Sequence, residues 1–221
     1  MKLNAPYASR ISGPGIALPA GRRERHRAEI RQRLFDEALR LFAQKGYFET
    51  TVEDITEAAD VGKGTFFNYF PTKEHILAVY GGKRVAVVER ALDQARATKG
   101  PVIDVLKELA SNAVGQSNQN PGVIRAIYAA HASCAPVRLE LQKRLQVSRR
   151  LLAKIIALAQ KRGEIRRDLT PLELARVTQI VFMGMTMSWS MNPDSSLRKS
   201  SESVWNLLLF GLCAPKEAKG S

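Results

Sequence analysis

Residues 63–69 (KGTFFNY) could bind DNA, because their side chains divide into an inward apolar face and an outward polar face. Helical spacing turns Phe66 inward, and Gly64 removes bulk where a backbone would have to approach DNA closely. A face of this kind fits the major groove only when a rigid corner holds it there. The side chains left mostly outside are Lys63, Thr65, Phe67, Asn68 and Tyr69.

The corner is predicted from the residues on either side. The sequence TVED at 51–54 is a capping-box pattern that opens a short helix, and Asp60-Val61-Gly62 forms a turn. The second short helix runs over about 63–69 and ends before Pro71. A longer helix, at about 23–45, precedes both. Two short helices joined by a three-residue turn and packed on a longer one form a helix-turn-helix.

The rest of the chain is also predicted to be helical. Gly and Pro residues separate long apolar-periodic segments, and no alternating strand pattern occurs. We therefore expect an all-α fold of about nine helices, with a three-helix helix-turn-helix domain followed by a C-terminal helical domain. The remaining helices are expected at about 73–97, 102–117, 122–133, 136–162, 171–191 and 196–213.

Residues 46–74 (GYFETTVEDITEAADVGKGTFFNYFPTKE) resemble the DNA-binding signature of the tetracycline-repressor (TetR) family, and the likeness extends over 27–75. The family pattern is roughly G-[YF]-x-x-T-T-[VI]-x-x-[IV]-A-x-x-A-G-V-[ST]-x-[GA]-x-[LIF]-Y-x-[YH]-F-x-[SN]-K-[ED]. The resemblance implies nine or ten helices, of which the first three bind DNA and the others bind a ligand and form a homodimer. It also implies a transcription regulator, a repressor that a small-molecule effector releases from palindromic double-stranded DNA.

The resemblance implies contacts with base edges or flanking phosphates from the second short helix. Lys63 matches a position from which it can reach guanine O6 and N7, and Asn68 one from which it can reach adenine or phosphate. The methyl group of Thr65 can contact a thymine methyl. Phe67 occupies a contact position as well, and Gly64 allows close approach.

Three further positions match phosphate contacts: Thr51, Tyr69 and Lys73. Each has a structural alternative. Thr51 could be only a helix cap, Tyr69 (like Phe67) partly core, and Lys73 a solvated residue in the first turn of its helix.

The sequence departs from the family pattern at three positions. Asp60 replaces the usual turn Gly, although Asp tolerates the left-handed region better than most residues. Gly62 replaces Ser or Thr before the second short helix and is a weaker N-cap. Phe67 replaces the usual Tyr, so the hydroxyl contact with phosphate is lost there.

Other chemistry is poorly supported. No Ser/His/Asp set, paired catalytic carboxylates, Gly-rich phosphate loop or metal cluster appears, and the chain has only three His. His131 and Cys134 could form half of a metal site, but packing against a core or pocket is the favoured interpretation. We therefore expect no enzyme activity, no cofactor and no metal. A DNA-binding architectural protein without an effector remains an alternative.

Charge does not locate the DNA site. The net charge of +13 favours an anionic partner, yet residues 36–73 carry a net charge of −3. The surplus lies in residues 1–35 (+6) and 138–167 (+8). The arginines from Arg22 to Arg27 could be solvated or could track phosphates or the minor groove. The second block could be a solvated helix face or could serve an acidic effector.

The C-terminal helices are predicted to form a ligand pocket and a dimer interface. The helices at 171–191 and 196–213 are apolar on more than one side, as in helices buried on two faces. Two chains sharing these four helices would explain that pattern. The pocket candidates are Tyr128, His131, Cys134, Phe182, Met185 and Trp189. The interface candidates are Val181, Met185, Val204, Trp205, Leu208 and Leu212.

We therefore expect a flexible basic arm at 1–21, a DNA-binding domain at 22–75 with its motif at about 50–70, a ligand-binding and dimerisation domain at 76–215, and a flexible tail at 216–221. Two isolated cysteines and the absence of a signal peptide favour a cytoplasmic protein. The uncharged run at 177–191 is too short to span a bilayer, so no membrane partner is expected.

Overall fold

The computed structural model describes residues 21–119, 121–192 and 197–212. These contain nine helices and no strand, which confirms the predicted all-α fold, and the helix ends agree with the predicted ones to within two residues. No helix in these ranges is both long and apolar enough to cross a membrane. The predicted arm and tail, and Cys213, lie outside the described residues. The helices are α1 (Arg22–Lys45), α2 (Val52–Ala58), α3 (Lys63–Tyr69), α4 (Glu74–Ala97), α5 (Val102–Gln119), α6 (Pro121–Ser133), α7 (Ala135–Lys161), α8 (Pro171–Met191) and α9 (Leu197–Leu212).

Helix ends follow from local side chains. Thr51 and Asp54 form a reciprocal capping box at the start of α2, as predicted, and Thr170 with Glu173 does the same for α8. Gly46 ends α1 at a φ of 90°, which is a conformation that favours glycine. Asp60 adopts a φ of 51° in the turn between α2 and α3, so it takes the left-handed conformation of the glycine that it replaces.

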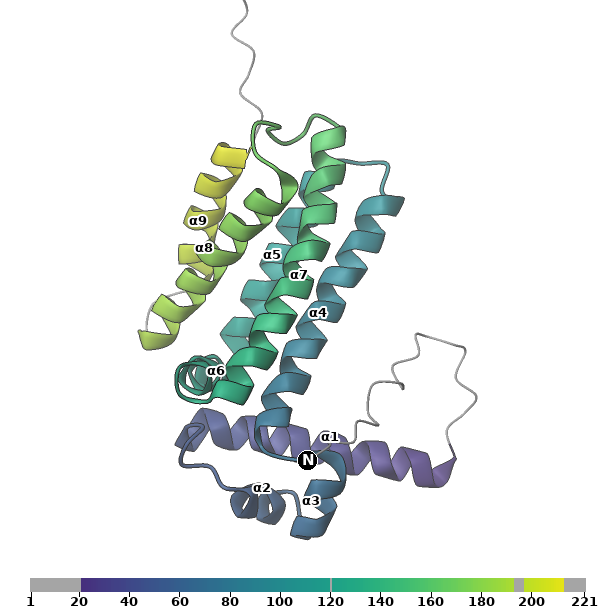
Figure 1. Cartoon of the computed structure of the whole chain (residues 1–221), viewed down its shortest axis with the longest axis vertical. Coiled ribbons are helices and arrows are strands. Elements are labelled where there is room, and N and C mark those ends of the chain that lie inside the picture. Colours follow the sequence, from purple (N-terminus) through teal and green to yellow (C-terminus); the bar gives the residue numbers. More distant parts are fainter. Residues whose placement is uncertain (1–20, 120, 193–196, 213–221) are drawn as a thin grey trace, which may run out of the picture.

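The helices form two layers (Figure 1). Helices α1, α2 and α3 lie together at one end, and α4 rises from them into a bundle with α5, α7, α8 and α9. Helix α6 lies across the base of this bundle, against α1. Its Gly122 is buried so closely against α1 that a Cβ there would lie 2.5 Å from the Cα of Ala43.

The core has three parts. One cluster fills the space under α1 to α3 and includes Ile76 and Leu77 of α4, Ala126 and Ala130 of α6, and Val137 of α7. The layer of α1, α2 and α3 and the bundle therefore share a single core at their junction. A second cluster joins the far ends of α4, α5, α7 and α8. A third contains Val114, Ile124, Trp189 and Leu197.

Candidate functional site

Helix α3 presents one face to the core and the other to solvent, as predicted. Phe66 is fully buried, with its ring centroid 5.8 Å from that of Phe70. On the opposite side Lys63, Phe67 and Asn68 are exposed, and Phe67 is 52% exposed. The outer side of α3 therefore offers one apolar ring between polar side chains.

The remaining residues of α3 divide between solvent and the core. Gly64 is exposed, and a Cβ built on it would meet nothing within 4 Å, so the outer surface of the helix is open there. Thr65 and Tyr69 are half-buried. Tyr69 packs against the first core cluster, so it is partly a core residue.

Thr51 has a clear structural function as the N-cap of α2. Its hydroxyl accepts from the Asp54 amide at 3.1 Å, and Asp54 accepts from the Thr51 amide at 2.9 Å. Lys45 of α1 donates to the same carboxylate at 2.8 Å. The hydrogen bond from Lys45, followed by those from Thr51, lowers the pKa of Asp54 to about 2. The start of α2 is therefore fixed, and Thr51 is exposed there.

Lys63 is held by an ion pair with Glu53 of α2. The hydrogen bond from Lys63 is the main reason why the pKa of Glu53 lies below its usual value. Both side chains are exposed. Because exposed ion pairs are weak, this one leaves the ammonium group available to another acceptor.

Lys73 lies at the N-cap of α4, and its ammonium group points into the protein. It donates to the carbonyl oxygens of Tyr47 and Thr50, each at 2.9 Å, and lies 4.5 Å from the centroid of the Tyr47 ring. Next to it, the Tyr47 hydroxyl donates to Glu74 at 2.6 Å. Burial, reinforced by Glu74, raises the pKa of Tyr47. These contacts favour a positioning role for Lys73, in which it joins the α1–α2 loop to α4.

Replacing Lys73 by Met is expected to lower the free energy of unfolding by about 1.5–3 kcal/mol, which is the usual contribution of hydrogen bonds from a charged group. Urea denaturation measures this value. Arg27→Met is the control, since it removes an exposed cation from α1 in the same layer and should cause a much smaller loss. Equal losses for the two variants would show that the bonds between Lys73 and the carbonyls do not stabilise the junction.

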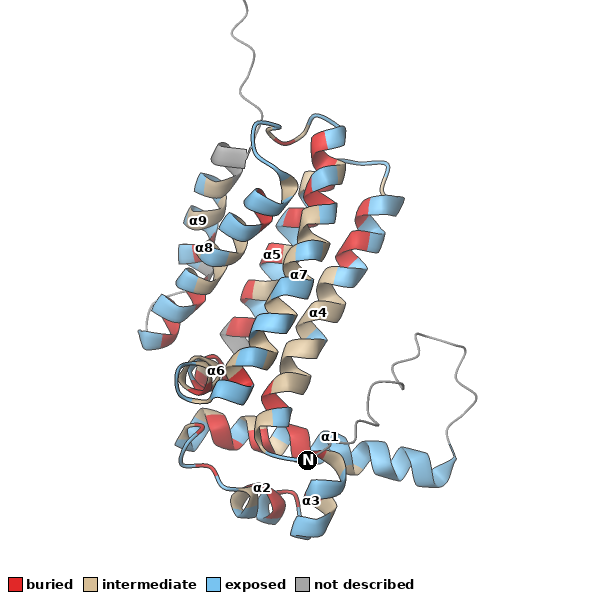
Figure 2. Cartoon of the chain, viewed as in Figure 1, coloured by how far each residue is buried: buried red, intermediate tan, exposed pale blue. Residues whose placement is uncertain are grey.

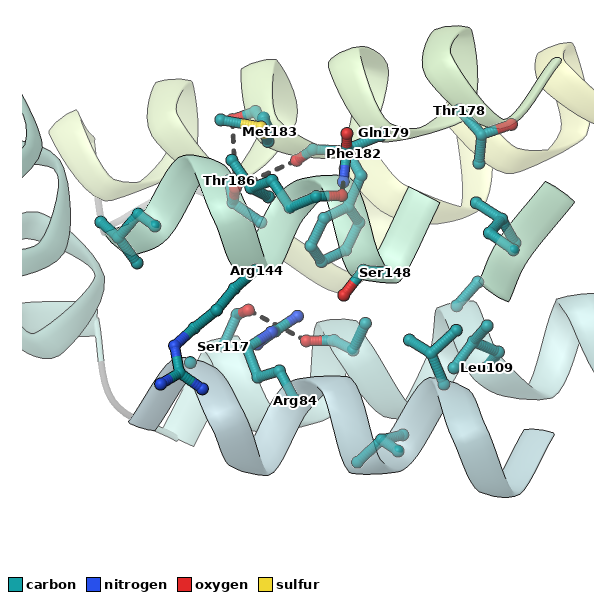
Figure 3. Close-up of a pocket in the computed structure, with 18 of the residues that line it drawn as sticks. Arg84, Leu109, Ser117, Arg144, Ser148, Thr178, Gln179, Phe182, Met183 and Thr186 are labelled. Carbon is teal, nitrogen blue, oxygen red and sulfur yellow. Dashed lines mark hydrogen bonds between the residues drawn. The ribbon is translucent and has the colours of Figure 1, made fainter. Parts of the chain in front are cut away.

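A cavity of about 260 Å³ lies inside the bundle between α4, α5, α6, α7 and α8 (Figure 3). Its lining is mainly apolar. Three predicted pocket residues line it: Tyr128, His131 and Phe182. The Tyr128 hydroxyl is 2.8 Å from both the Met183 carbonyl oxygen and the Thr186 hydroxyl, and burial raises the pKa of Tyr128.

The other three predicted pocket residues lie outside this cavity. Cys134 caps α7 and packs against the first core cluster, near Tyr47. Met185 and Trp189 line a shallow groove between α8 and α9. Helix α8 is apolar on several sides, and only the side with Phe182 and Met183 faces the cavity. No group of three or more His, Cys, Asp or Glu in the described part of the chain could hold a metal ion.

The predicted dimer residues also separate into groups. Trp205 lines the cavity from α9. Val181, Met185 and Val204 line the groove between α8 and α9, and Leu208 is half-buried. The side chain of Leu212 lies outside what the structure describes. A separate stripe along the exposed side of α8 consists of Val177, Ile180, Met187 and Met191.

Most of the cavity lining was not predicted from sequence, and it includes two charged residues, Arg84 of α4 and Arg144 of α7. The signal that could have revealed them is the pair Gly81-Gly82, which is unusual inside a long helix. Arg144 belongs to the basic block at 138–167. That block is not simply a solvated face, since Arg149 donates to Gln179 and Arg162 donates to loop carbonyls.

The surface at the start of α1 is basic and exposed. Residues 22–29 are all exposed, and this part of the helix projects beyond the rest of the layer of α1, α2 and α3 (Figure 2). Its arginines, from Arg22 to Arg27, are free of contact with the core. This position suits either of the two predicted interpretations, solvation or contact with flanking DNA.

Comparison with known proteins agrees with this geometry. Residues 34–80 match the family model of bacterial regulatory proteins of the tetR family. The chain is 29% identical over 155 residues to the transcriptional repressor DhaR of Mycobacterium sp. (strain GP1), covering 67% of this chain and 76% of DhaR.

Two solved structures share the fold. FadR of Thermus thermophilus, a TetR-family repressor in complex with lauroyl-CoA, has a TM-score of 0.65 and 24% identity, covering 86% of this chain and 99% of FadR. FadR of Bacillus subtilis, in complex with stearoyl-CoA, has a TM-score of 0.71 and 22% identity. The match covers 81% of this chain and 98% of that FadR.

Proposed function

The chain belongs to the tetR family of bacterial regulatory proteins, and from this premise we infer that it is a transcription repressor that a small molecule releases from operator DNA. The observation that carries the inference is α3, whose outer face is exposed at one end of the molecule while Phe66 and Phe70 fix its inner face. Residues 22–75 would bind DNA, and residues 76–215 would bind the effector and form the dimer.

Specific recognition is assigned to α3. Lys63 and Asn68 have the donors that read guanine and adenine in the major groove, and the Thr65 methyl group suits thymine. Gly64 leaves room for close approach, and Phe67 offers an apolar contact. Lys63 would exchange its ion pair with Glu53 for a contact with DNA.

Phosphate contacts are assigned to Thr51 and Tyr69 at the edges of this face. Lys73 also stands at this edge, and its bonds to the α1–α2 loop support an indirect contribution in which it holds the face in position.

A homodimer would place two copies of α3 on one side of DNA. The exposed apolar stripe on α8 and the α8–α9 groove support an interface there. Two-fold symmetry would then space the recognition helices by about 34–36 Å for successive major grooves, and the operator would be a near-palindrome.

The cavity supports regulation by a small molecule and disfavours an architectural protein that has no effector. Helix α4 begins beside the DNA-binding layer and lines the cavity from Tyr80 to Val88. A ligand that favours another position of α4 would therefore change the spacing of the two recognition helices. Coupling of this kind is typically about 1–3 kcal/mol and is reciprocal, so operator DNA would weaken effector binding by the same factor.

Selection of bound duplexes from a random-sequence pool tests the proposal. It should recover an inverted repeat whose affinity falls with salt. Lys63→Ala and Asn68→Ala should each weaken binding to that duplex by about 1–3 kcal/mol in mobility-shift titrations. Lys99→Ala, which removes a lysine beyond the far end of α4, is the control and should leave affinity unchanged. No enriched sequence in the selection would contradict specific DNA binding.

A further inference from the structure

Two arginines in the cavity have buried nitrogen atoms without a hydrogen-bond partner. These atoms are Nη1 of Arg84 and Nε of Arg144, and no other buried side-chain nitrogen or oxygen in the described part of the chain lacks one. Burying a charged donor without an acceptor is costly, so such groups call for a specific explanation. Both side chains reach into the cavity (Figure 3).

The cavity itself holds no carboxylate that could satisfy them. Among its described lining residues, the titratable ones besides the two arginines are His131 and the tyrosines Tyr80 and Tyr128. Arg144 reaches Glu140 with Nη2 at 2.8 Å, one turn back on its own helix and outside the lining. Arg84 lies over the Phe182 ring, 5.6 Å from its centroid. Both guanidinium groups therefore lie at a mainly apolar lining that has no acidic side chain of its own.

The backbone of α4 is shaped to accept Arg144. A Cβ on Gly82 would lie 2.6 Å from Nη1 of Arg144, and a Cβ on Gly81 would lie 3.0 Å from its Cδ. Glycine inside a helix costs roughly 0.5–1 kcal/mol relative to alanine, so the pair is explained by the room that it gives to this side chain. Arg144 thereby rests on α4 within three residues of Arg84.

The two arginines lie in the lower half of the cavity, above residues of α6 such as Ile127 and His131. Helix α4 rises from the layer of α1, α2 and α3, α5 descends and α7 rises again, so Arg84, Ser117 and Arg144 lie toward the lower part. The upper part is lined by apolar residues, among them Val88, Leu109 and Leu152. A volume of about 260 Å³ is slightly below the usual range of about 300–1,000 Å³ for ligand pockets. It therefore suits a small ligand, or the apolar part of a larger one.

We propose that the effector is an amphipathic anion, with an apolar chain in the upper cavity and an oxyanion held between Arg84 and Arg144. This rests on the proposed function, in which the cavity is the effector site. The oxyanion supplies the missing acceptors, and guanidinium groups bind carboxylate and phosphate oxygens through paired donors. Because one arginine comes from α4 and the other from α7, the bound anion would also join these two helices.

Binding of three matched probes to the purified full-length chain tests the charge requirement. Dodecanoate, its methyl ester and lauroyl-CoA share one apolar chain, and Trp205 in the cavity wall provides a fluorescence signal. We expect dodecanoate, lauroyl-CoA or both to bind about 10- to 100-fold more tightly than the neutral ester. If dodecanoate binds more tightly, the arginines bind a carboxylate. If lauroyl-CoA binds more tightly, they bind the phosphates of the coenzyme A part.

Substitutions test the assigned residues. Arg84→Gln and Arg144→Gln should each lower the affinity for the anionic probe by about 10- to 100-fold and leave the affinity for the ester unchanged. Gly82→Ala keeps both charges but displaces the Arg144 guanidinium. It should therefore also lower the affinity for the anionic probe. Lys143→Gln removes an exposed charge from α7 and should have no effect. Thermal melting of each variant confirms that the bundle is folded.

The proposal is overturned if the ester binds as tightly as the anions, if the arginine variants lose nothing, or if none of the three probes binds. None of these outcomes touches DNA recognition, which duplex selection measures separately. Release of the selected duplex by a neutral ligand would preserve the proposed function and refute the anion site.

Discussion

Replacing Ile180 and Met187 together by Glu is expected to convert the dimer into a monomer and to abolish tight operator binding. Ile180 is 59% exposed and Met187 42% exposed in the single chain, and they lie on one stripe of α8 with Val177 and Met191. A carboxylate buried there without a partner would disfavour association strongly. A monomer holds one half-site and loses the gain from simultaneous contacts, which is about 10²- to 10⁴-fold.

Sedimentation equilibrium measures the oligomeric state, and mobility-shift titration with the selected duplex measures the affinity. Leu139→Glu is the control, because it places a carboxylate at an exposed apolar position on α7, away from the stripe on α8. It should leave both the dimer and the affinity intact. A double variant that stays dimeric and binds normally would place the interface elsewhere on the molecule.

Phe66→Ala is expected to unfold the DNA-binding layer, while Phe67→Ala is expected to leave it folded. Phe66 is fully buried against Phe70, and truncation of such a residue costs about 3–5 kcal/mol. This is a large part of the roughly 5–15 kcal/mol that stabilises an average domain. Phe67 points outward, so its truncation should change stability by no more than about 0.5 kcal/mol.

The two phenylalanines are neighbours in one short helix, so each serves as the control for the other. Urea denaturation should show the loss only for Phe66→Ala. Both variants should bind the selected duplex more weakly, one because α3 is no longer folded and the other because it lacks the exposed ring. Phe67→Ala with unchanged affinity would remove this residue from the proposed DNA contact.

The helix-turn-helix could be predicted from sequence because its signals are local. Capping at Thr51, the turn at Asp60 and the break at Pro71 each act within a few residues, so the helix bounds and the outer face of α3 follow directly. The direction in which the Lys73 side chain points was harder to predict. Its hydrogen-bond acceptors are backbone carbonyls more than twenty residues away in the chain.

The cavity could be predicted only in part, because its wall comes from several helices. Periodicity shows that α8 and α9 are apolar on several sides, but it does not say which side meets a cavity, a neighbouring helix or a partner chain. For this reason the sequence did not show that Trp205 lines the cavity while Met185 and Trp189 line the groove between α8 and α9. No sequence expectation was made for Arg84, and Arg144 belongs to the basic block at 138–167. Only the packing of α4 against α7 brings both into the lining of one cavity.

The core shared between α1 and α6 limits how such regulators can be recombined. A chimaera that joins residues 21–75 to the bundle of another regulator would lose Ala126, Ala130 and Val137 from beneath α1. It would also need a residue as small as Gly122 to face Ala43. The unit that can be exchanged is therefore discontinuous in sequence, and a new DNA specificity is more safely introduced by replacing the outer side chains of α3 within the native scaffold.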